Sequence, residues 1–450
     1  MMTWTKLLCL DRHGDRPKDR GPGPERDRTP FQRDYDRLVF SSAFKRLHDK
    51  TQVFPLPEND LVHSRLTHSL EVACVGRSLG TVVGQKILAR GGLPAWCSAR
   101  DFGDIVAAAC LAHDIGNPPF GHSGEDTIQS WFLGDGQGYL ADLSEAERYD
   151  LLSFEGNAQG FRILTRLQMP ANPGLKLTYA TLAAFTKYPR ASAPRGVRFD
   201  GNSAKKHGYH QAEREFFADV ADRVGLLPVP KTVHHGAHSI SLPHWTRHPL
   251  AFLVEAADDI CYAILDLEDG VRLGYVDVDL AVDCLGPLAS AGPGGLRPRS
   301  VEDDDKEYVA YLRARAINTL IQEVTDTFLR REPEMMDGRF DAALTKEISS
   351  APALSRIKKD TRRLCYEAKE VLEIELAGHD VLTHLLELFV PAALGKPGAR
   401  NARLLKLLPI EPTGTPYERI LRVTDHLSGM TDSYAVSLYR KLLGVALPSR

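Results

Sequence analysis

Residues 111–125 combine side chains that bind metal ions with residues that end a helix. The stretch reads Leu-Ala-His-Asp-Ile-Gly-Asn-Pro-Pro-Phe-Gly-His-Ser-Gly-Glu. A His-Asp pair alone has little specificity, because the chain contains His48-Asp49, His113-Asp114 and His379-Asp380. Only His113-Asp114 closes an apolar helical run and is followed by a glycine and two prolines, which must end the helix. Neighbouring side chains on a regular helix point about 100° apart, so adjacent ligands converge more easily where the backbone leaves the helix.

Two further segments contain the other ligand types that a metal site needs. Residues 65–71 place His68 near the start of a long predicted helix, and residues 255–262 place carboxylates inside an apolar helix, where an unpaired carboxylate is costly. Taken alone, neither His68 nor Asp258 is more than a hypothesis. Together, two histidines and two carboxylates suit Mg, Mn, Fe, Co, Ni or Zn with positions left open for water, and the spacing does not choose among these metals.

The elements that must position these residues are helices. Apolar residues recur at steps of three and four along residues 66–89, 104–112 and 249–267, whereas the alternation typical of strands is scarce. We therefore expect an all-α fold with few short strands. Polar stretches rich in glycine and proline predict long loops at 189–208 and 286–306 and a break at 395–401.

The composition is that of a globular protein. Hydrophobic residues make up 43% and charged residues 26% of the 450, so the chain can bury a large core. The 56 Lys and Arg nearly balance the 59 Asp and Glu, which excludes a chain-wide basic surface for nucleic acid. Seven scattered cysteines without a Cys-x-x-Cys pair indicate reduced thiols, and we find neither a signal peptide nor an apolar run of about 20 residues. We expect a cytoplasmic protein without membrane association.

Three segments together are similar to the metal motifs of a known enzyme family. Residues 67–69, 113–125 and 255–262 resemble the metal motifs of the HD-domain deoxynucleoside triphosphate (dNTP) triphosphohydrolases, the bacterial dGTPase family. The similarity continues through residues 36–47, 50–56, 154–159 and 187–189. An ordered set of motifs is far more specific than one His-Asp pair. The resemblance implies an all-α HD fold and an enzyme that hydrolyses dNTPs.

The resemblance also implies that one divalent metal ion, with Mg or Mn favoured for activity, is bound by His68, His113, Asp114 and Asp258. Asp258 is preferred over Asp259 partly because Asp258, Tyr262 and Asp266 share one helix face at i, i+4 and i+8. Asn117 stands where many HD proteins have histidine, which argues against the additional histidine ligands of two-metal sites.

His122 and Glu125 follow the metal pair and are the catalytic candidates. A divalent cation lowers the pKa of its water and polarises a phosphoryl oxygen, which leaves the departing 5'-oxygen in need of a proton. A carboxylate beside an imidazole would orient the ring and raise its pKa. The resemblance places the catalytic pair here, whereas the alternative is that His122 only caps the loop. The implied reaction is attack of metal-activated water at the α-phosphorus, which releases a deoxynucleoside and inorganic triphosphate.

The remaining candidates would bind the substrate, whose roughly four negative charges must be met locally. Stretches that resemble the phosphate-contacting regions contain Arg65, Asn157, Lys187, Tyr188 and Lys206, although Lys206 could align one residue to either side. Tyr262 would exclude a 2'-hydroxyl, unless it is only a core residue, and Gln52 and Asp266 would bond the 3'-hydroxyl. Tyr366 and Glu367 lie in a segment that resembles the one near the base, and a glutamate acceptor suits the donors of guanine, so dGTP is the first expected substrate.

The candidate residues lie on both sides of the polar breaks, which favours one discontinuous helical core over independent domains. We expect residues 1–30, dense in Arg, Asp, Pro and Gly after residue 14, to form a mobile N-terminal segment. Residues 31–285 would form the HD-domain catalytic core. Residues 286–450 would form a C-terminal helical lobe that completes the nucleotide pocket and the oligomer contacts.

Two alternative functions stay open at this stage. One is an HD phosphohydrolase that acts on nucleoside monophosphates or phosphodiesters, and the other is a nucleotide-sensing or single-stranded nucleic-acid-binding scaffold. The set of Gln52, Tyr262 and Asp266 disfavours the first, and the complete ligand set disfavours the second. The resemblance further implies a homo-oligomer, consistent with a hexamer, and allows a dNTP or single-stranded DNA effector.

Overall fold

The structure is a computed structural model that describes residues 1–14, 28–53, 62–169, 174–197, 199–229, 231–235, 238–292, 294–300, 304–395 and 398–445. Its first half contains α1 (Trp4–Leu7), α2 (Pro30–Phe40), α3 (Ser42–Arg46), α4 (Arg65–Leu88), α5 (Ala99–Ala112), α6 (Gly121–Leu133), α7 (Glu145–Leu152), α8 (Gly156–Arg162), α9 (Tyr179–Phe185) and α10 (Arg214–Val224). Its second half contains α11 (Pro249–Arg272), α12 (Val278–Ala291), α13 (Asp305–Met336), α14 (Ala351–Thr361), α15 (Lys369–Leu394), α16 (Ala399–Leu405), α17 (Pro416–Ser428) and α18 (Asp432–Leu442).

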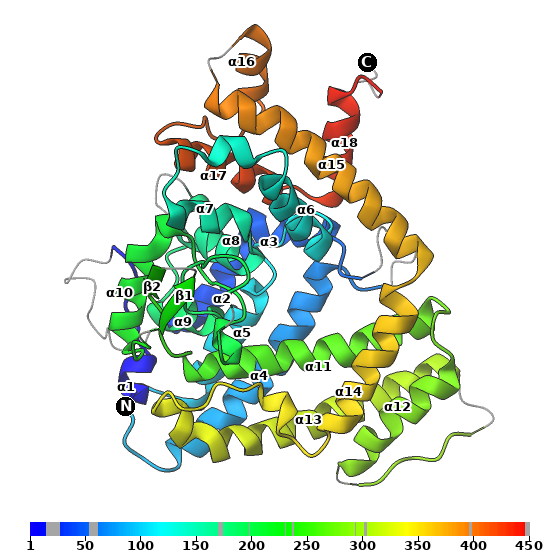
Figure 1. Ribbon diagram of the computed structural model, residues 1–450. Coiled ribbons are helices and arrows are strands. Elements are labelled where there is room, and N and C mark those ends of the chain that lie inside the picture. Colours follow the sequence, from blue (N-terminus) through cyan, green and yellow to red (C-terminus); the bar gives the residue numbers. More distant parts are fainter. Residues whose placement is uncertain are drawn as a thin grey trace.

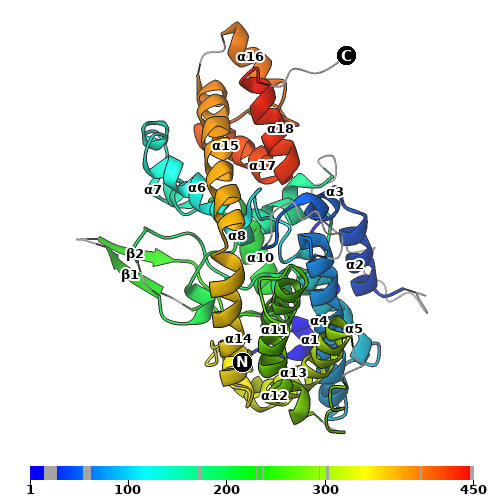
Figure 2. The same cartoon turned by 90° about the vertical axis from the view of Figure 1, so that its right-hand side faces the viewer.

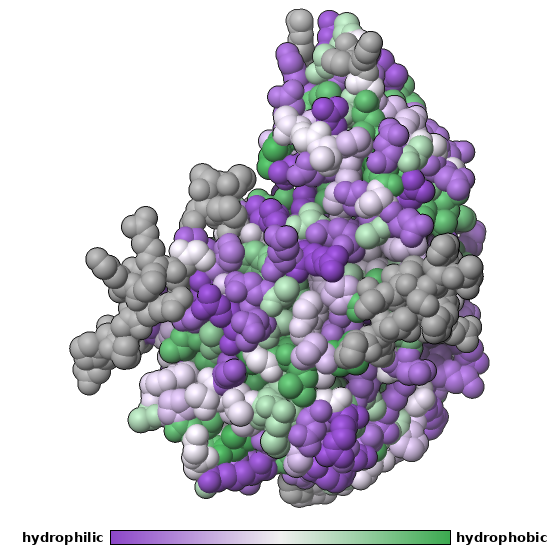
Figure 3. Space-filling view, turned by 60° about the vertical axis from the view of Figure 1, so that its left-hand side comes forward, coloured by the Kyte–Doolittle hydropathy of each residue, from purple (hydrophilic) through white to green (hydrophobic). Residues whose placement is uncertain are grey.

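The sheet content of the described residues is one antiparallel hairpin, β1 (Lys231–His235) and β2 (His238–Leu242), which extends from the body in Figure 2. Lys231 lies opposite Leu242, and His235 lies opposite His238. The expected all-α fold with few short strands is therefore confirmed. No helix within the described ranges combines the length and the apolarity that a membrane span requires. On the face shown in Figure 3, hydrophobic residues are scattered among hydrophilic ones.

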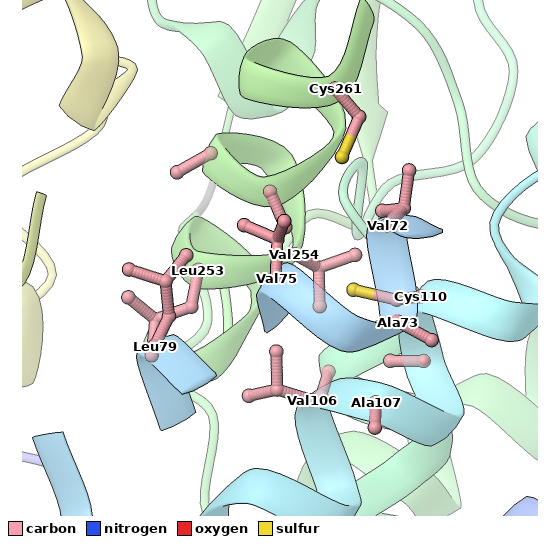
Figure 4. Packing of buried hydrophobic residues seen from close by; sticks show 14 of the residues in the cluster. Val72, Ala73, Val75, Leu79, Val106, Ala107, Cys110, Leu253, Val254 and Cys261 are labelled. Atoms are coloured by element: carbon pink, nitrogen blue, oxygen red, sulfur yellow. The ribbon is translucent and has the colours of Figure 1, made fainter. Parts of the chain in front are cut away.

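Helices α4 and α5 cross so closely that glycine is required in α4. Gly76, Gly80 and Gly84 recur every four residues and so share one helix face. A Cβ atom at Gly80 would lie 2.7 Å from the carbonyl oxygen of Phe102 and 2.9 Å from the Cα of Gly103. Apolar residues of α11 pack against both helices, as Figure 4 shows. These three helices form the core that carries the predicted metal ligands.

A second apolar cluster joins α6 and α7 to the C-terminal helices. It includes Phe132 of α6, Phe389 of α15 and Ile420 of α17, all fully buried. In Figures 1 and 2, α16, α17, α18 and the end of α15 form one end of the molecule, and α4, α5, α11 and α13 form the other. The start of α15 lies between the two ends, so it can contribute to a site that borders both clusters.

Two segments differ from the sequence-based expectation. Of the segment 1–30 that was predicted to be mobile, residues 15–27 lie outside the described residues. The N-terminal part is packed: Met2 and Trp4 are buried, and the Trp4 indole donates to Glu332 at 2.8 Å. The loop predicted from residue 286 begins only after Ala291, because Leu285 and Leu288 are buried in the main core and the helix continues with them.

Candidate metal centre and active site

Three helices bring the four predicted metal ligands together. His68 lies in the first turn of α4, which Ser64 caps by accepting the Thr67 amide. His113 is the C-cap of α5, Asp114 follows it, and Asp258 lies in the middle of α11. Nε2 of His113 is 3.5 Å from a carboxylate oxygen of Asp114 and 3.5 Å from Oδ1 of Asp258, and Nε2 of His68 is 3.4 Å from the same Oδ1.

The protonation and bonding of these side chains suit a divalent cation. Nε2 of His68 is buried and has no hydrogen-bond partner among the described residues. Nδ1 of His113 is 2.6 Å from the carbonyl oxygen of Cys110, which can only accept, so the proton is on Nδ1 and the Nε2 lone pair faces the cluster. Such a second hydrogen bond is typical of histidines that bind metals. The donor set is thus two imidazole nitrogens and two carboxylates that share one small space.

Buried cations keep both carboxylates ionised. Asp114 accepts from the Arg65 guanidinium at 2.6 Å and from the Asn117 amide at 2.6 Å, and Asp258 accepts from Lys187 at 2.7 Å. Burial alone would raise the pKa of Asp114, but the charge of the Arg65 guanidinium opposes it, and the pKa is held below its ordinary value. The pKa of Asp258 is held low against the same effect of burial, mainly by the charge of Lys187.

The local turn after the metal pair depends on one glycine. Phe120 has a positive φ of 62° and Gly121 one of 59°, and α6 starts there. A Cβ atom on Gly121 would lie 2.5 Å from a guanidinium nitrogen of Arg65, so the missing side chain leaves room for the arginine that holds Asp114. The same turn places His122 in the first turn of α6, close to the metal centre.

The expected pairing of His122 with Glu125 is wrong in this structure. Glu125 is buried and accepts from the Gly156 amide at 2.6 Å, with Lys206 at 3.6 Å, and the described residues show no hydrogen bond between Glu125 and His122. Desolvation in the cleft and the charge of Lys206 lower the pKa of His122, whereas a paired carboxylate would have raised it. Burial raises the pKa of Glu125 and, together with the Glu125 charge, raises that of Glu155 to about 7.

A cleft of about 470 Å³ opens beside the metal centre. Six predicted site residues line it: Gln52, Arg65, His122, Tyr262, Tyr366 and Glu367. Tyr262 lies one turn after Asp258 in α11, and its ring centroid is 5.8 Å from that of Tyr366. Because Arg65 both lines the cleft and bonds Asp114, the cleft and the metal centre are directly connected.

Asp266 and Gln52 differ in how accessible their oxygens are. Asp266 is 2% exposed and accepts from the Tyr366 hydroxyl at 2.5 Å, and burial raises its pKa to about 7. It lies behind Tyr366 and does not line the cleft. Oε1 of Gln52 is buried without a hydrogen-bond partner among the described residues and belongs to the cleft wall. Gln52 therefore has an acceptor free for a ligand donor, whereas Asp266 already has a partner.

The remaining predicted residues surround the metal centre and Glu125 and do not line the cleft. Lys187 bonds Asp258, and Lys206 donates to Glu155 at 2.9 Å, whereas Lys205 is exposed. Asn157 donates to the same oxygen of Glu155 at 2.7 Å. Tyr188 is half-buried, with the Arg247 guanidinium 6.0 Å from its ring centroid.

Two residues that support the site were missed. Lys50 is buried and donates to the backbone oxygens of Asn117 at 2.6 Å and Ser428 at 2.7 Å, and burial lowers its pKa to about 7. Asp432, the first residue of α18, accepts from the amides of Thr51 at 2.9 Å and Phe120 at 3.0 Å. Lys50 could have been considered from the sequence, because it is a basic residue next to Thr51 in a segment that resembles the family. No feature of the sequence near Asp432 indicated its partners.

Known proteins are similar to this chain over 92% or more of its length. The HD domain family model matches residues 65–153. A deoxyguanosinetriphosphate triphosphohydrolase-like protein of Synechocystis sp. is 45% identical, over 99% of this chain and 100% of its own length. A protein of the same description from Pseudomonas aeruginosa is 40% identical, with 100% of both chains covered. The deoxyguanosinetriphosphate triphosphohydrolase of Salmonella paratyphi A is 30% identical, over 92% of this chain and 94% of its own.

The fold and the metal centre define an HD-domain hydrolase. With similarity of this extent along the full chain, the protein belongs to the HD-domain deoxynucleoside triphosphate triphosphohydrolase family.

Proposed function

We propose that the protein hydrolyses a dNTP, with dGTP as the first candidate, to a deoxynucleoside and inorganic triphosphate. The observation that carries the proposal is the connection made by Arg65, which bonds a predicted metal ligand and lines the cleft with Tyr262 and Tyr366. A triphosphate beside the four ligands would place its sugar and base against these rings. The names of the relatives support the same chemistry.

The four ligands would hold a divalent cation, with Mg or Mn favoured, although the donor set also accommodates Fe, Co, Ni or Zn. When bound, such a cation lowers the pKa of a water molecule and polarises a phosphoryl oxygen. Arg65 and Lys187 keep Asp114 and Asp258 ionised and oriented for this purpose.

His122 would supply the proton that the leaving group needs. Water would add to the α-phosphorus and release one proton to the solvent, the bond between phosphorus and the 5'-oxygen would break, and that oxygen would take the proton of the His122 imidazolium. In the free protein the pKa of His122 is lowered by desolvation and by Lys206. The roughly four negative charges of a triphosphate would raise that pKa when the substrate binds, so protonation and binding are coupled.

We infer that the phosphates are met by Arg65, Asn157, Lys187, Tyr188 and Lys206. The cations among them already face carboxylates, Lys206 beside Glu125 and Glu155 and Lys187 beside Asp258. Their positions are thus fixed before the substrate arrives, which lowers the entropic cost of binding. A small polyanion needs only these few cations and a metal, so a net charge of −3 is no obstacle.

For the nucleoside, Gln52 would accept from the 3'-hydroxyl with its unpartnered Oε1, and the ring of Tyr262 would exclude a 2'-hydroxyl. Asp266 would act through Tyr366, whose hydroxyl it holds. Glu367 is exposed on the cleft wall and would accept from guanine. The start of α15 closes this side of the cleft, so residues 286–450 would complete the pocket. Oligomer contacts, an effector and a cytoplasmic location stay predictions.

One experiment tests the function with a control that the chain itself offers. The purified protein is incubated with Mg or Mn and each dNTP and NTP singly, and products are separated by ion-exchange chromatography. His113→Ala should abolish turnover and lower bound metal. His379→Ala changes an exposed histidine that also precedes an aspartate, and it should preserve both. Release of a monophosphate and pyrophosphate, or full activity of His113→Ala with unchanged metal, would refute the proposal.

A further inference from the structure

A second group of metal-ligand side chains lies away from the cleft, at Asp150 of α7 and at His207 and His210 of the segment before α10. Their exposed fractions are 0%, 3% and 1%. One ligand atom from each lies within 4.8 Å of the others. Tetrahedral ligand atoms about 2.0–2.2 Å from an ion are about 3.3–3.6 Å from one another. Side-chain rotations that move the ligand atoms by about 1 Å would therefore bring them to binding distance.

Three of the four imidazole nitrogens of this group have no hydrogen-bond partner in the part of the chain that the structure describes. Both ring nitrogens of His210 and Nε2 of His207 are buried without a partner among the described residues. A buried polar atom without a partner is costly, and histidine has one donor and one acceptor to satisfy. An ion would engage the unshared electron pairs and so remove part of this cost.

The carboxylate of the group is held in place from three sides. Oδ1 of Asp150 accepts from the Ser192 hydroxyl at 2.6 Å and is 4.0 Å from Nδ1 of His210. Oδ2 accepts from the Gln211 amide at 2.7 Å and from the Tyr417 hydroxyl. Supporting hydrogen bonds of this kind orient the ligands of metal sites.

We propose that Asp150, His207 and His210 bind a divalent ion of borderline softness, Zn²⁺, Co²⁺, Ni²⁺ or Fe²⁺, in a structural site. Two imidazoles and one carboxylate suit these ions better than Mg²⁺, which prefers oxygen. The burial of all three side chains leaves no route for a substrate. The ion would tie α7 and, through Tyr417, α17 to the loop that carries Lys206. This inference does not depend on the proposed function.

The test isolates this site in the full chain. His113→Ala/Asp258→Ala protein, which lacks the predicted catalytic site, is freed of metal with a chelator and titrated with Co²⁺ while visible absorption is recorded. Elemental analysis after desalting gives the stoichiometry. We expect about one ion per chain, with the absorption bands of a nitrogen and oxygen site. Adding His210→Leu should abolish binding, and adding Asp150→Asn, which keeps the size of the side chain, should do the same.

A melting curve distinguishes loss of the site from loss of the fold. Zn²⁺ should raise the melting temperature of the His113→Ala/Asp258→Ala protein but not that of its Asp150→Asn derivative, provided that both have the circular dichroism of a folded helical protein. The proposal is overturned if the folded double variant binds no Co²⁺ at micromolar concentrations. It is also overturned if the double variant still binds Co²⁺ as before when His210→Leu is added and when Asp150→Asn is added.

Discussion

Gln52→Ala should remove the discrimination between a 3'-hydroxyl and a 3'-hydrogen on the substrate. Oε1 of Gln52 is buried on the cleft wall and has no partner among the described residues, so it is the acceptor best placed for that hydroxyl. Asp266 is less suited because Tyr366 already donates to it. A neutral hydrogen bond of this kind contributes about 0.5–1.5 kcal/mol, which corresponds to about a 2- to 13-fold change in kcat/KM.

The assay is a cycle of two enzymes and two substrates. kcat/KM is measured for dGTP and for its 3'-deoxy analogue with the unmodified protein and with Gln52→Ala. Removing the hydroxyl from the substrate and removing the amide from the protein should each lower kcat/KM by the same factor. Making both changes should lower kcat/KM little more than either change alone. Gln168→Ala is the matched control, because that glutamine lies outside the cleft and bonds Ser42. Equal, additive losses in the cycle would refute the assignment of Gln52.

Three other perturbations follow from the same geometry. Arg65→Met removes the charge that holds Asp114 ionised, so the metal concentration for half-maximal activity should rise about 10- to 100-fold; an unchanged value would contradict this. With His122 as the proposed acid, kcat/KM should fall as the pH rises through the lowered pKa of His122 in the free protein, and kcat should fall at a higher pH; both pH-dependent falls should be absent from His122→Asn. Tyr262→Ala should increase turnover of GTP relative to dGTP, and a constant ratio would mean that Tyr262 is only a core residue.

The closeness of the four predicted metal ligands could be anticipated because these residues lie where helical patterns begin, end or carry a charge. His68 opens α4, His113 ends α5 before glycine and proline, and Asp258 is an acid in an apolar helix. The periodicity identified the three helices, and their packing brings the ligands within 3.5 Å. Local sequence therefore contained most of the information about the ligands.

The rest could not be predicted because it depends on contacts between residues distant in sequence. Glu125 is only three positions after His122 in the sequence, but its neighbours in the structure are the Gly156 amide and Lys206, which lie far along the chain. Asp432 bonds Thr51 across 381 positions. Such pairs leave no periodicity or spacing that a single sequence can show.

The central claim is hydrolysis at the α-phosphorus, and the position of an isotopic label tests it most directly. dGTP is hydrolysed by the metal-loaded protein in H₂¹⁸O, the products are separated, and the mass of each product is measured by mass spectrometry. We predict that the heavy oxygen appears in inorganic triphosphate and that deoxyguanosine carries none. Label in the 5'-hydroxyl of deoxyguanosine, or dGMP and pyrophosphate as the products, would contradict the proposed chemistry.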